Sequence, residues 1–189
     1  MADKFGFGAV SPILKSLGHY PGQQYSALAT RIVVPGLETT NDYANYVFTF
    51  GEIIKFDYKE ATYRVRPIAS TDANTNNIAV IMRDVVGGTN YNEDIIVSPK
   101  RNVPFSLFVL NKEQYGAIAV VCSNTASVVV GGTPYIGLGT NGTVAGTVYG
   151  AAQGAAGADS LALTGWEFKT LPYEPSSTSA KAVIIGRAV

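Results

Sequence analysis

Residues 62–68 of this chain run Thr-Tyr-Arg-Val-Arg-Pro-Ile, and this stretch decides the fold class. The apolar residues at positions 63, 65 and 67 alternate with Arg64 and Arg66. Because successive side chains of a β-strand point to opposite faces of its sheet, an alternation of period two predicts a strand with one buried and one wet face.

Further short apolar segments lie on both sides of this stretch. Glycine, proline and asparagine separate them at intervals of about eight to twelve residues, which is the spacing of strands and turns in all-β domains. We expect strands at Arg31–Val34, Tyr46–Phe56, Thr62–Ile68, Ile78–Asp84, Ile95–Val97, Phe105–Leu110, Ile118–Cys122, Ser127–Val130, Tyr135–Leu138, Thr143–Tyr149, Leu161–Phe168 and Ala182–Arg187.

Glycines mark the expected turns and irregularities. Gly51 interrupts an apolar strand where a bulge or sharp bend would lie. Gly131-Gly132 and Asn141-Gly142 have the composition of hairpin turns. The alanine-rich stretch 151–162 contains two glycines that disfavour a helix, so we expect a loop there. About ten to twelve short strands in 189 residues indicate an all-β fold, a β-sandwich or a β-barrel of tulip-like shape.

Residues 1–30 differ from the rest of the chain. Glycine and proline recur throughout them, with aromatic residues between. Such a segment cannot form long regular structure, and ordering its backbone costs about 1–2 kcal/mol per residue unless it docks on a surface. We therefore expect an extended N-terminal arm at 1–30 and a single β domain at 31–189.

The charge balance excludes several functions. Fourteen basic residues match fourteen acidic ones without a block of either sign, so the pattern of a nucleic-acid binder or anionic-membrane binder is missing. Charged residues make up only 15% of the chain, below the roughly 25% of an average soluble domain. No apolar run is long enough to span a membrane. A surface so poor in charge predicts that much of it is covered.

The sequence Gly137-Leu138-Gly139-Thr140-Asn141-Gly142 matches the dinucleotide-binding fingerprint, with Asp159 downstream. That fingerprint binds pyrophosphate only when a helix begins at its third glycine. The residues that follow are rich in threonine and valine, so we interpret the match as a hairpin and expect no cofactor.

Residues for catalysis or metal binding are few. His19 is the only histidine, which prevents a multi-histidine metal site within one chain. Cys122, the only cysteine, ends an apolar strand without a basic neighbour and is expected to be a buried structural thiol. The carboxylates lack the spacing of a calcium loop. We expect neither a metal nor an enzymatic activity.

Aromatic residues are the surplus that catalysis does not explain. Eleven tyrosines and eight phenylalanines are available, and interfaces favour such large, rigid side chains. Several stand in turn-rich or strand-edge contexts. The expected contact residues toward a partner or a second subunit are Phe5, Phe7, Tyr20, Tyr25, Tyr43 and Tyr46.

Several segments between residues 46 and 189 resemble the decoration, or cement, proteins of tailed-phage heads. The early apolar strand through Phe50-Gly51 and the Gly165-Trp166 pair of a late strand are two of them. The full set is Val47–Ile54, Ile78–Asp84, Tyr115–Val121, Ser127–Ile136, Asp159–Phe168 and Ala180–Val189.

The resemblance implies a virion protein that is made in the host cytoplasm and binds the outer surface of the assembled capsid. Its partners would be the major capsid protein and its own copies, as a trimer or a dimer. It would reinforce the lattice without catalysis, and the aromatic arm would make the capsid contact.

Two other functions stay open on the sequence alone. A carbohydrate-binding or host-binding β-sandwich of a virion would show a row of exposed tyrosine and tryptophan side chains. An enzyme with two catalytic carboxylates is the other, although no spacing in the sequence supports it.

Overall fold

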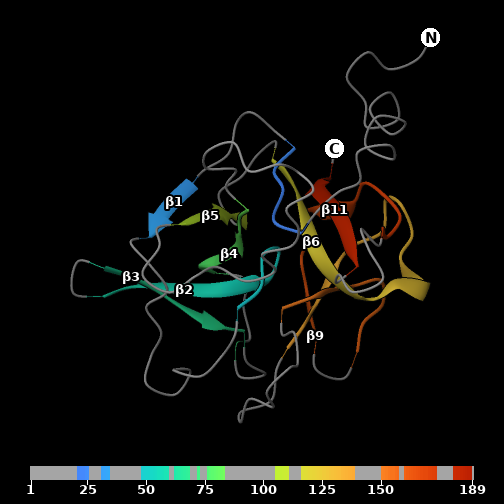
Figure 1. Cartoon of the computed structure of the whole chain (residues 1–189). Coiled ribbons are helices and arrows are strands. Elements are labelled where there is room, and N and C mark those ends of the chain that lie inside the picture. The colour runs from blue at the N-terminus through green and yellow to red at the C-terminus, as the bar shows by residue number, and fades with distance from the viewer. Residues whose placement is uncertain are drawn as a thin grey trace.

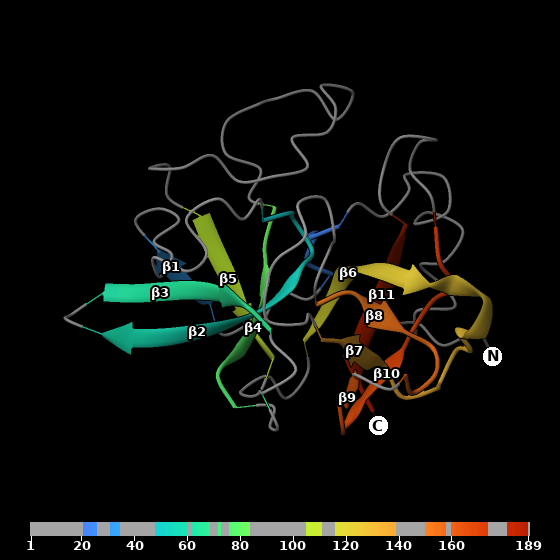
Figure 2. The same cartoon turned by 90° about the horizontal axis from the view of Figure 1, so that it is seen from below.

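The computed structural model describes most of the β domain (Figures 1 and 2). The described residues are 21–25, 31–34, 48–59, 62–68, 72, 76–83, 105–110, 116–138, 150–157, 160–173 and 181–188. They form the strands β1 (Arg31–Val34), β2 (Ile53–Lys59), β3 (Thr62–Pro67), β4 (Ile78–Ile81), β5 (Phe105–Val109), β6 (Ala117–Asn124), β7 (Tyr135–Gly137), β8 (Ala152–Gln153), β9 (Ser160–Ala162), β10 (Trp166–Phe168) and β11 (Ala182–Arg187).

The strands form two sheets, and the all-β prediction is confirmed. The first sheet has the order β1-β5-β4-β2-β3, and the second has the order β10-β11-β6-β8-β7-β9. Neighbouring strands are antiparallel except β6 and β8, which are parallel. In Figure 2 the first sheet occupies the left half of the molecule and the second the right half.

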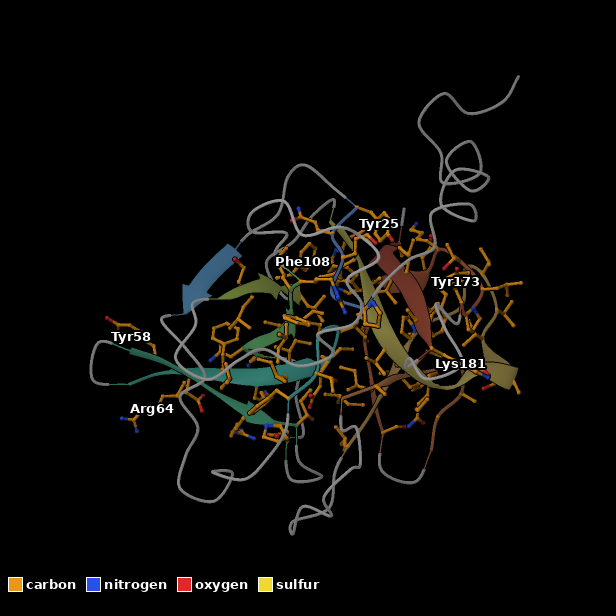
Figure 3. All side chains as sticks on the ribbon, in the orientation of Figure 1. Tyr25, Tyr58, Arg64, Phe108, Tyr173 and Lys181 are labelled. Carbon is orange, nitrogen blue, oxygen red and sulfur yellow. The ribbon has the colours of Figure 1, made fainter. Side chains whose placement is uncertain are left out.

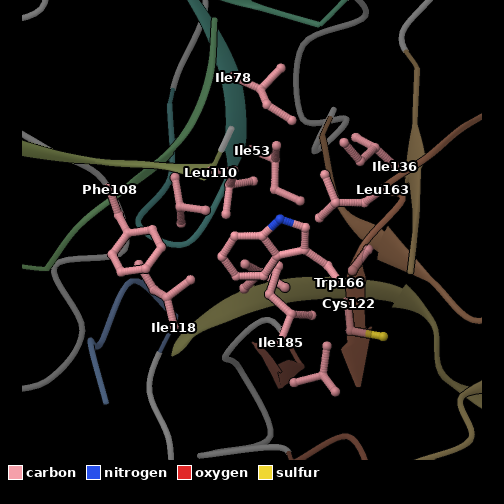
Figure 4. Close-up of a cluster of buried hydrophobic side chains, with 14 of the residues drawn as sticks. Ile53, Ile78, Phe108, Leu110, Ile118, Cys122, Ile136, Leu163, Trp166 and Ile185 are labelled. Atoms are coloured by element: carbon pink, nitrogen blue, oxygen red, sulfur yellow. The ribbon is translucent and has the colours of Figure 1, made fainter. Parts of the chain in front are cut away.

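The main core lies between the two sheets, because alternate residues of both face it. Ile53, Ile78, Val80 and Phe108 come from the first sheet, and Ile118, Val120, Val183 and Ile185 come from the second. Trp166 is central in this cluster (Figure 4) and its ring meets the ring of Phe108 edge-on, with centroids 6.3 Å apart. The tryptophan is 2% exposed.

The first sheet also buries its opposite face. That face carries Ile54, Phe56, Val65, Ala79, Ile81, Leu107 and Val109, and Phe48 from the chain before β2 joins the same cluster. The sheet curls around this second cluster until its two edge strands, β1 and β3, approach each other. A sheet buried on both faces explains why all four residues of β4 are buried.

Three glycines with positive φ share one local geometry. Gly22, Gly51 and Gly131 have φ angles of 82°, 80° and 84°. Each donates its N–H to a carbonyl on the facing strand, and the residue after it accepts the N–H of that same facing residue. Two residues thus oppose one, as in a β-bulge that begins with a left-handed glycine. The prediction of an irregularity at Gly51 is confirmed.

Several predicted strand boundaries are wrong because the chain turns within a stretch that was expected to be one strand. The expected strand 46–56 turns at Thr49–Glu52, and β2 begins only at Ile53. The expected strand 127–130 is instead a 3₁₀ turn, Thr125–Ser127, followed by a turn closed by the Gly132 N–H and the Val129 carbonyl. The expected strand 161–168 divides into β9 and β10 at Gly165, whose φ is 80°.

One strand lies where a loop was expected. Ala152–Gln153 forms β8 between β6 and β7, although the stretch 151–162 was predicted to be a loop. Its position depends on pairing with Cys122 of β6, thirty residues earlier in the chain. The predicted strands 95–97 and 143–149 and the Asn141-Gly142 turn lie outside the described residues.

Candidate functional site

Tyr25 is the expected contact residue whose position the structure describes. Its ring packs on the outer face of the second sheet against Ala117, Ala119 and Ile184. Its hydroxyl donates a hydrogen bond to Oε1 of Gln23 at 2.9 Å. Tyr25 is therefore half-buried against its own chain (Figure 3). The other expected contact residues, Phe5, Phe7, Tyr20, Tyr43 and Tyr46, lie outside the described residues.

The segment 21–25 is built into the β domain by its backbone. The N–H of Gly22 donates to the Ala119 carbonyl at 2.8 Å, and the Gly22 carbonyl accepts the N–H of Arg83 at 2.9 Å. The N–H of Tyr25 donates to the Ala117 carbonyl at 2.8 Å. These residues thus lie between β6 of one sheet and the chain that follows β4 of the other. The last described part of the predicted arm belongs to the folded unit.

A second bridge between the sheets runs beside the first. The N–H of Gly51 donates to the Ile81 carbonyl of β4, and the Gly51 carbonyl accepts the N–H of Val121 of β6. The N–H of Ile53 donates to the carbonyl of Gly150, and the N–H of Gly150 donates to the carbonyl of Gly137 in β7. We call residues 21–23, 51–53 and 150 the seam. Gly137 of the fingerprint sequence therefore has a structural role in β7.

Glu52 is a charged residue within the seam. It is 0% exposed, and its Oε2 accepts the backbone N–H of Thr49 at 3.0 Å. Its own carbonyl accepts the N–H of Ile81 at 3.0 Å. A buried carboxylate needs such donors, because burial without them costs several kcal/mol. The side chain holds the turn at 49–52, and the sequence alone did not identify it.

A charged cluster lies on the wet face of β2 and β3, on the face that the Arg64 and Arg66 alternation predicted. Arg66 makes two 2.7 Å hydrogen bonds to the two carboxylate oxygens of Asp72, and its Nε lies 3.7 Å from Asp57. Lys55, beside Arg66 in the register, donates from Nζ to the Asn76 carbonyl. Both cations thus attach the chain between β3 and β4 to the sheet.

Lys55 is more buried than its place on a wet face suggested, at 6% exposure. Burial lowers the pKa of its amine, and the nearby Arg66 cation lowers it further, whereas Asp72 and Asp57 act in the opposite direction. The alternation of residues did not indicate this burial, because Asn76, which binds the amine, comes from the segment after β3.

Four large apolar side chains are exposed among the described residues. Tyr58, at the far end of β2, is 65% exposed (Figure 3). Val129 and Val130, in the turn before Gly131, are 66% and 55% exposed, and Leu171 after β10 is 62% exposed. Tyr58 belongs to the first sheet, and the other three lie in loops that connect strands of the second sheet. None of them is among the expected contact residues.

Cys122 is buried, as the sequence predicted. Burial raises the pKa of its thiol to about 11, and the nearby Lys181 offsets only part of that effect. Such a thiol is almost wholly protonated at neutral pH, which makes it a poor nucleophile.

No group of three or more His, Cys, Asp or Glu side chains gathers into a metal site within the described residues. No helix in that part of the chain is long and apolar enough to cross a membrane. His19, Asp159 and positions 139–142 of the fingerprint sequence lie outside the described residues.

Comparisons with known proteins give no match. Neither a protein-family model nor a curated protein nor a solved structure is similar to this chain.

Proposed function

We propose that this chain is a structural protein of a viral shell, bound to the outside of the assembled capsid as a decoration protein. The observation that carries the proposal is the anchoring of residues 21–25 at the seam. Backbone hydrogen bonds fix this segment to β6 and to the chain after β4. Residues 1–20 therefore start from a firmly held point of the domain, and they include the aromatic Phe5, Phe7 and Tyr20.

A firmly anchored arm suits a lattice-binding protein for a physical reason. Once the domain touches the shell, its arm is held near its binding site at high effective concentration. The affinity of each single contact can then be modest while the protein stays bound to the shell. The low charge content, the exposed apolar side chains at β2 and in loops of the second sheet, and the resemblance of residues 46–189 to decoration proteins agree with this proposal.

The rival proposal, a carbohydrate-binding module, has less support. Its tryptophan would need to be exposed to stack on a sugar ring, and Trp166 is 2% exposed in the main core. The exposed aromatic residue that the structure describes is Tyr58, on a different sheet from Trp166.

The test is co-sedimentation with empty shells assembled from the major capsid protein of the same source. Full-length protein should sediment with the shells, and a variant lacking residues 2–20 should stay in the supernatant. Because the deletion stops before Pro21, it keeps the seam bonds. A double variant, Phe5→Ser with Phe7→Ser, should weaken binding at least about tenfold, whereas the control Lys4→Ser with Lys15→Ser should change it little. Shell binding that survives the deletion would move the contact elsewhere, and full-length protein that never sediments would refute the proposal.

A further inference from the structure

The strands β2 and β3 continue past the rest of the first sheet as a two-stranded ribbon. Within the described residues, the β4 side of β2 is paired no further than Phe56, whose N–H donates to the Asn77 carbonyl, whereas β2 and β3 pair as far as Lys59 and Thr62. Figure 3 shows Tyr58 and Arg64 at the end of this ribbon, directed away from the two cores. A two-stranded ribbon is marginally stable in water by itself, so a projecting one is suited to contact with another surface.

The charges at the end of β2 indicate that this other surface is the same edge of a second copy of the chain. Asp57, Tyr58 and Lys59 follow one another, so the acidic and basic residues are placed symmetrically about the tyrosine. If two copies of β2 pair antiparallel about a two-fold axis at residue 58, residue 57 of each copy lies opposite residue 59 of the other. Two Asp–Lys pairs and one Tyr–Tyr pair result, and directly opposite pairs of these kinds stabilise a sheet.

Neighbouring registers do not place opposite charges across from each other. A two-fold axis at residue 57 would place aspartate opposite aspartate, and an axis at residue 59 would place lysine opposite lysine. Registers halfway between residues would bring the wet face of one copy onto the dry face of the other. The axis at Tyr58 is thus selected by charge.

The other edge of the ribbon disfavours the same pairing. On β3, an axis at Arg64 places that arginine opposite itself, and an axis at Val65 places Arg64 opposite Arg66. Pro67 has no N–H to donate. Like charges and proline are the usual protection of an edge strand against its own copies. The ribbon therefore has one protected edge and one self-complementary edge.

We propose that the β2 edge at Asp57–Lys59 is the two-fold contact between two copies of this chain, with Tyr58 of each copy at its centre. The exposure of Tyr58, 65%, and of the Asp57 side chain, 58%, leaves both accessible to a second copy. Three residues per copy cover far less than the roughly 800 Å² per partner of a standard interface. The dimer is consequently weak in solution and gains importance when copies are concentrated on a shell, so in that respect the inference rests on the proposed function.

The first experiment is sedimentation equilibrium of the full chain up to millimolar concentration. The expected result is a reversible dimer, whose dissociation constant rises at least about tenfold in Tyr58→Ser and in Lys59→Glu. Leu171→Ser removes a side chain of similar exposure from the chain after β10 and should leave the dimer unchanged. Melting temperatures show that each variant is folded.

A charge exchange provides a second test that loss of folding cannot imitate. Asp57→Lys makes the edge basic at both positions, and Lys59→Asp makes it acidic at both. Each variant alone should sediment as a monomer, and an equimolar mixture should form a heterodimer.

A disulfide crosslink between two copies tests whether the two-fold axis lies at residue 58. In Tyr58→Cys the two thiols lie opposite each other, so mild oxidation should give a disulfide-linked dimer. Leu171→Cys is the control that should not. The native thiol of Cys122 is buried and should not interfere.

A chain that is monomeric at every concentration, or a dimer insensitive to these changes, would overturn the inference. Shell co-sedimentation separates the two proposals. A monomer that still binds shells contradicts only the ribbon contact. A ribbon dimer that does not bind shells contradicts only the proposed function.

Discussion

Gly51 and Gly22 lie in backbone contact at the seam between the two sheets. A Cβ atom at position 51 would stand 2.7 Å from the backbone nitrogen of Gly22 and 2.5 Å from the Cβ of Pro21. Both glycines also have positive φ. The N-terminal segment and the turn before β2 are therefore fitted to each other, and the two sheets depend on that fit.

Gly51→Ala should destabilise the protein by about 3 kcal/mol, because it adds a backbone clash to the strain of a left-handed alanine. Gly131→Ala is the matched control. It has the same bulge geometry and a φ of 84°, but a Cβ there meets nothing within 4 Å. The control should lose only about 1 kcal/mol. Urea unfolding of both variants measures the difference. Equal losses would show that the close approach at the seam contributes nothing.

Asp72→Asn should destabilise the chain by about 1–2 kcal/mol, because it removes the carboxylate that Arg66 binds with two hydrogen bonds. The two side chains are 25% and 11% exposed, which limits screening by solvent. Arg66→Lys should cost a similar amount, since an ammonium cannot make the paired contact. The control is Glu167→Gln, which breaks the single contact to Lys169 two residues away on the strand edge. It should cost less than about 0.5 kcal/mol, and a larger loss than in Asp72→Asn would contradict the assignment.

The fold class could be predicted because the residue patterns that indicate strands are formed by neighbours in the sequence. Phe105–Leu110 and Ala182–Arg187 consist mostly of apolar residues, and both form strands close to the expected bounds. Errors arose at glycines, since Gly51 and Gly165 reverse or shift the chain through a positive φ that apolar spacing does not reveal. The strand at Ala152–Gln153 was missed because it exists only through long-range pairing.

The candidate site was less predictable than the fold. Tyr25 was singled out for the composition around it, which does not show that its ring packs on the second sheet. Tyr58 was not singled out, because its exposure depends on where β4 stops pairing with β2. The signal that could have found it is the symmetric Asp57-Tyr58-Lys59 order in the short stretch between the expected strands Tyr46–Phe56 and Thr62–Ile68.

Stability should rise with pH in the alkaline range because of Lys55. Its pKa is lowered in the folded protein, mainly by burial, from an ordinary value of 10.5. Between the lowered value and 10.5 the unfolded chain still holds the proton that the folded chain has lost, so raising the pH favours folding. The cost of burying the charged amine is thus present in full at neutral pH and disappears above 10.5.

Comparison with Lys55→Met isolates this effect from other groups that titrate near pH 10. The free energy of unfolding, measured in urea from pH 7 to 10.5, should increase for the wild-type chain relative to the variant. Parallel pH profiles would show that Lys55 has the same pKa in both states. A relative decrease would mean that its pKa is raised by its partners.

The boundary of the N-terminal arm can be tested by two deletions that differ by five residues. Removing residues 2–20 should leave the melting temperature nearly unchanged, because the seam bonds begin at Gly22. Removing residues 2–25 deletes the partners of the Arg83 N–H and of the backbone groups of Ala117 and Ala119. Buried backbone groups that lose their partners cost about 1 kcal/mol or more each, so the longer deletion should destabilise the domain by several kcal/mol. It also uncovers the small apolar surface under Tyr25. Circular dichroism melts compare the two variants, and hydrogen exchange at Ala119 locates the change. If both deletions melt alike, residues 21–25 rest on the domain without supporting it, and the arm extends to the start of β1.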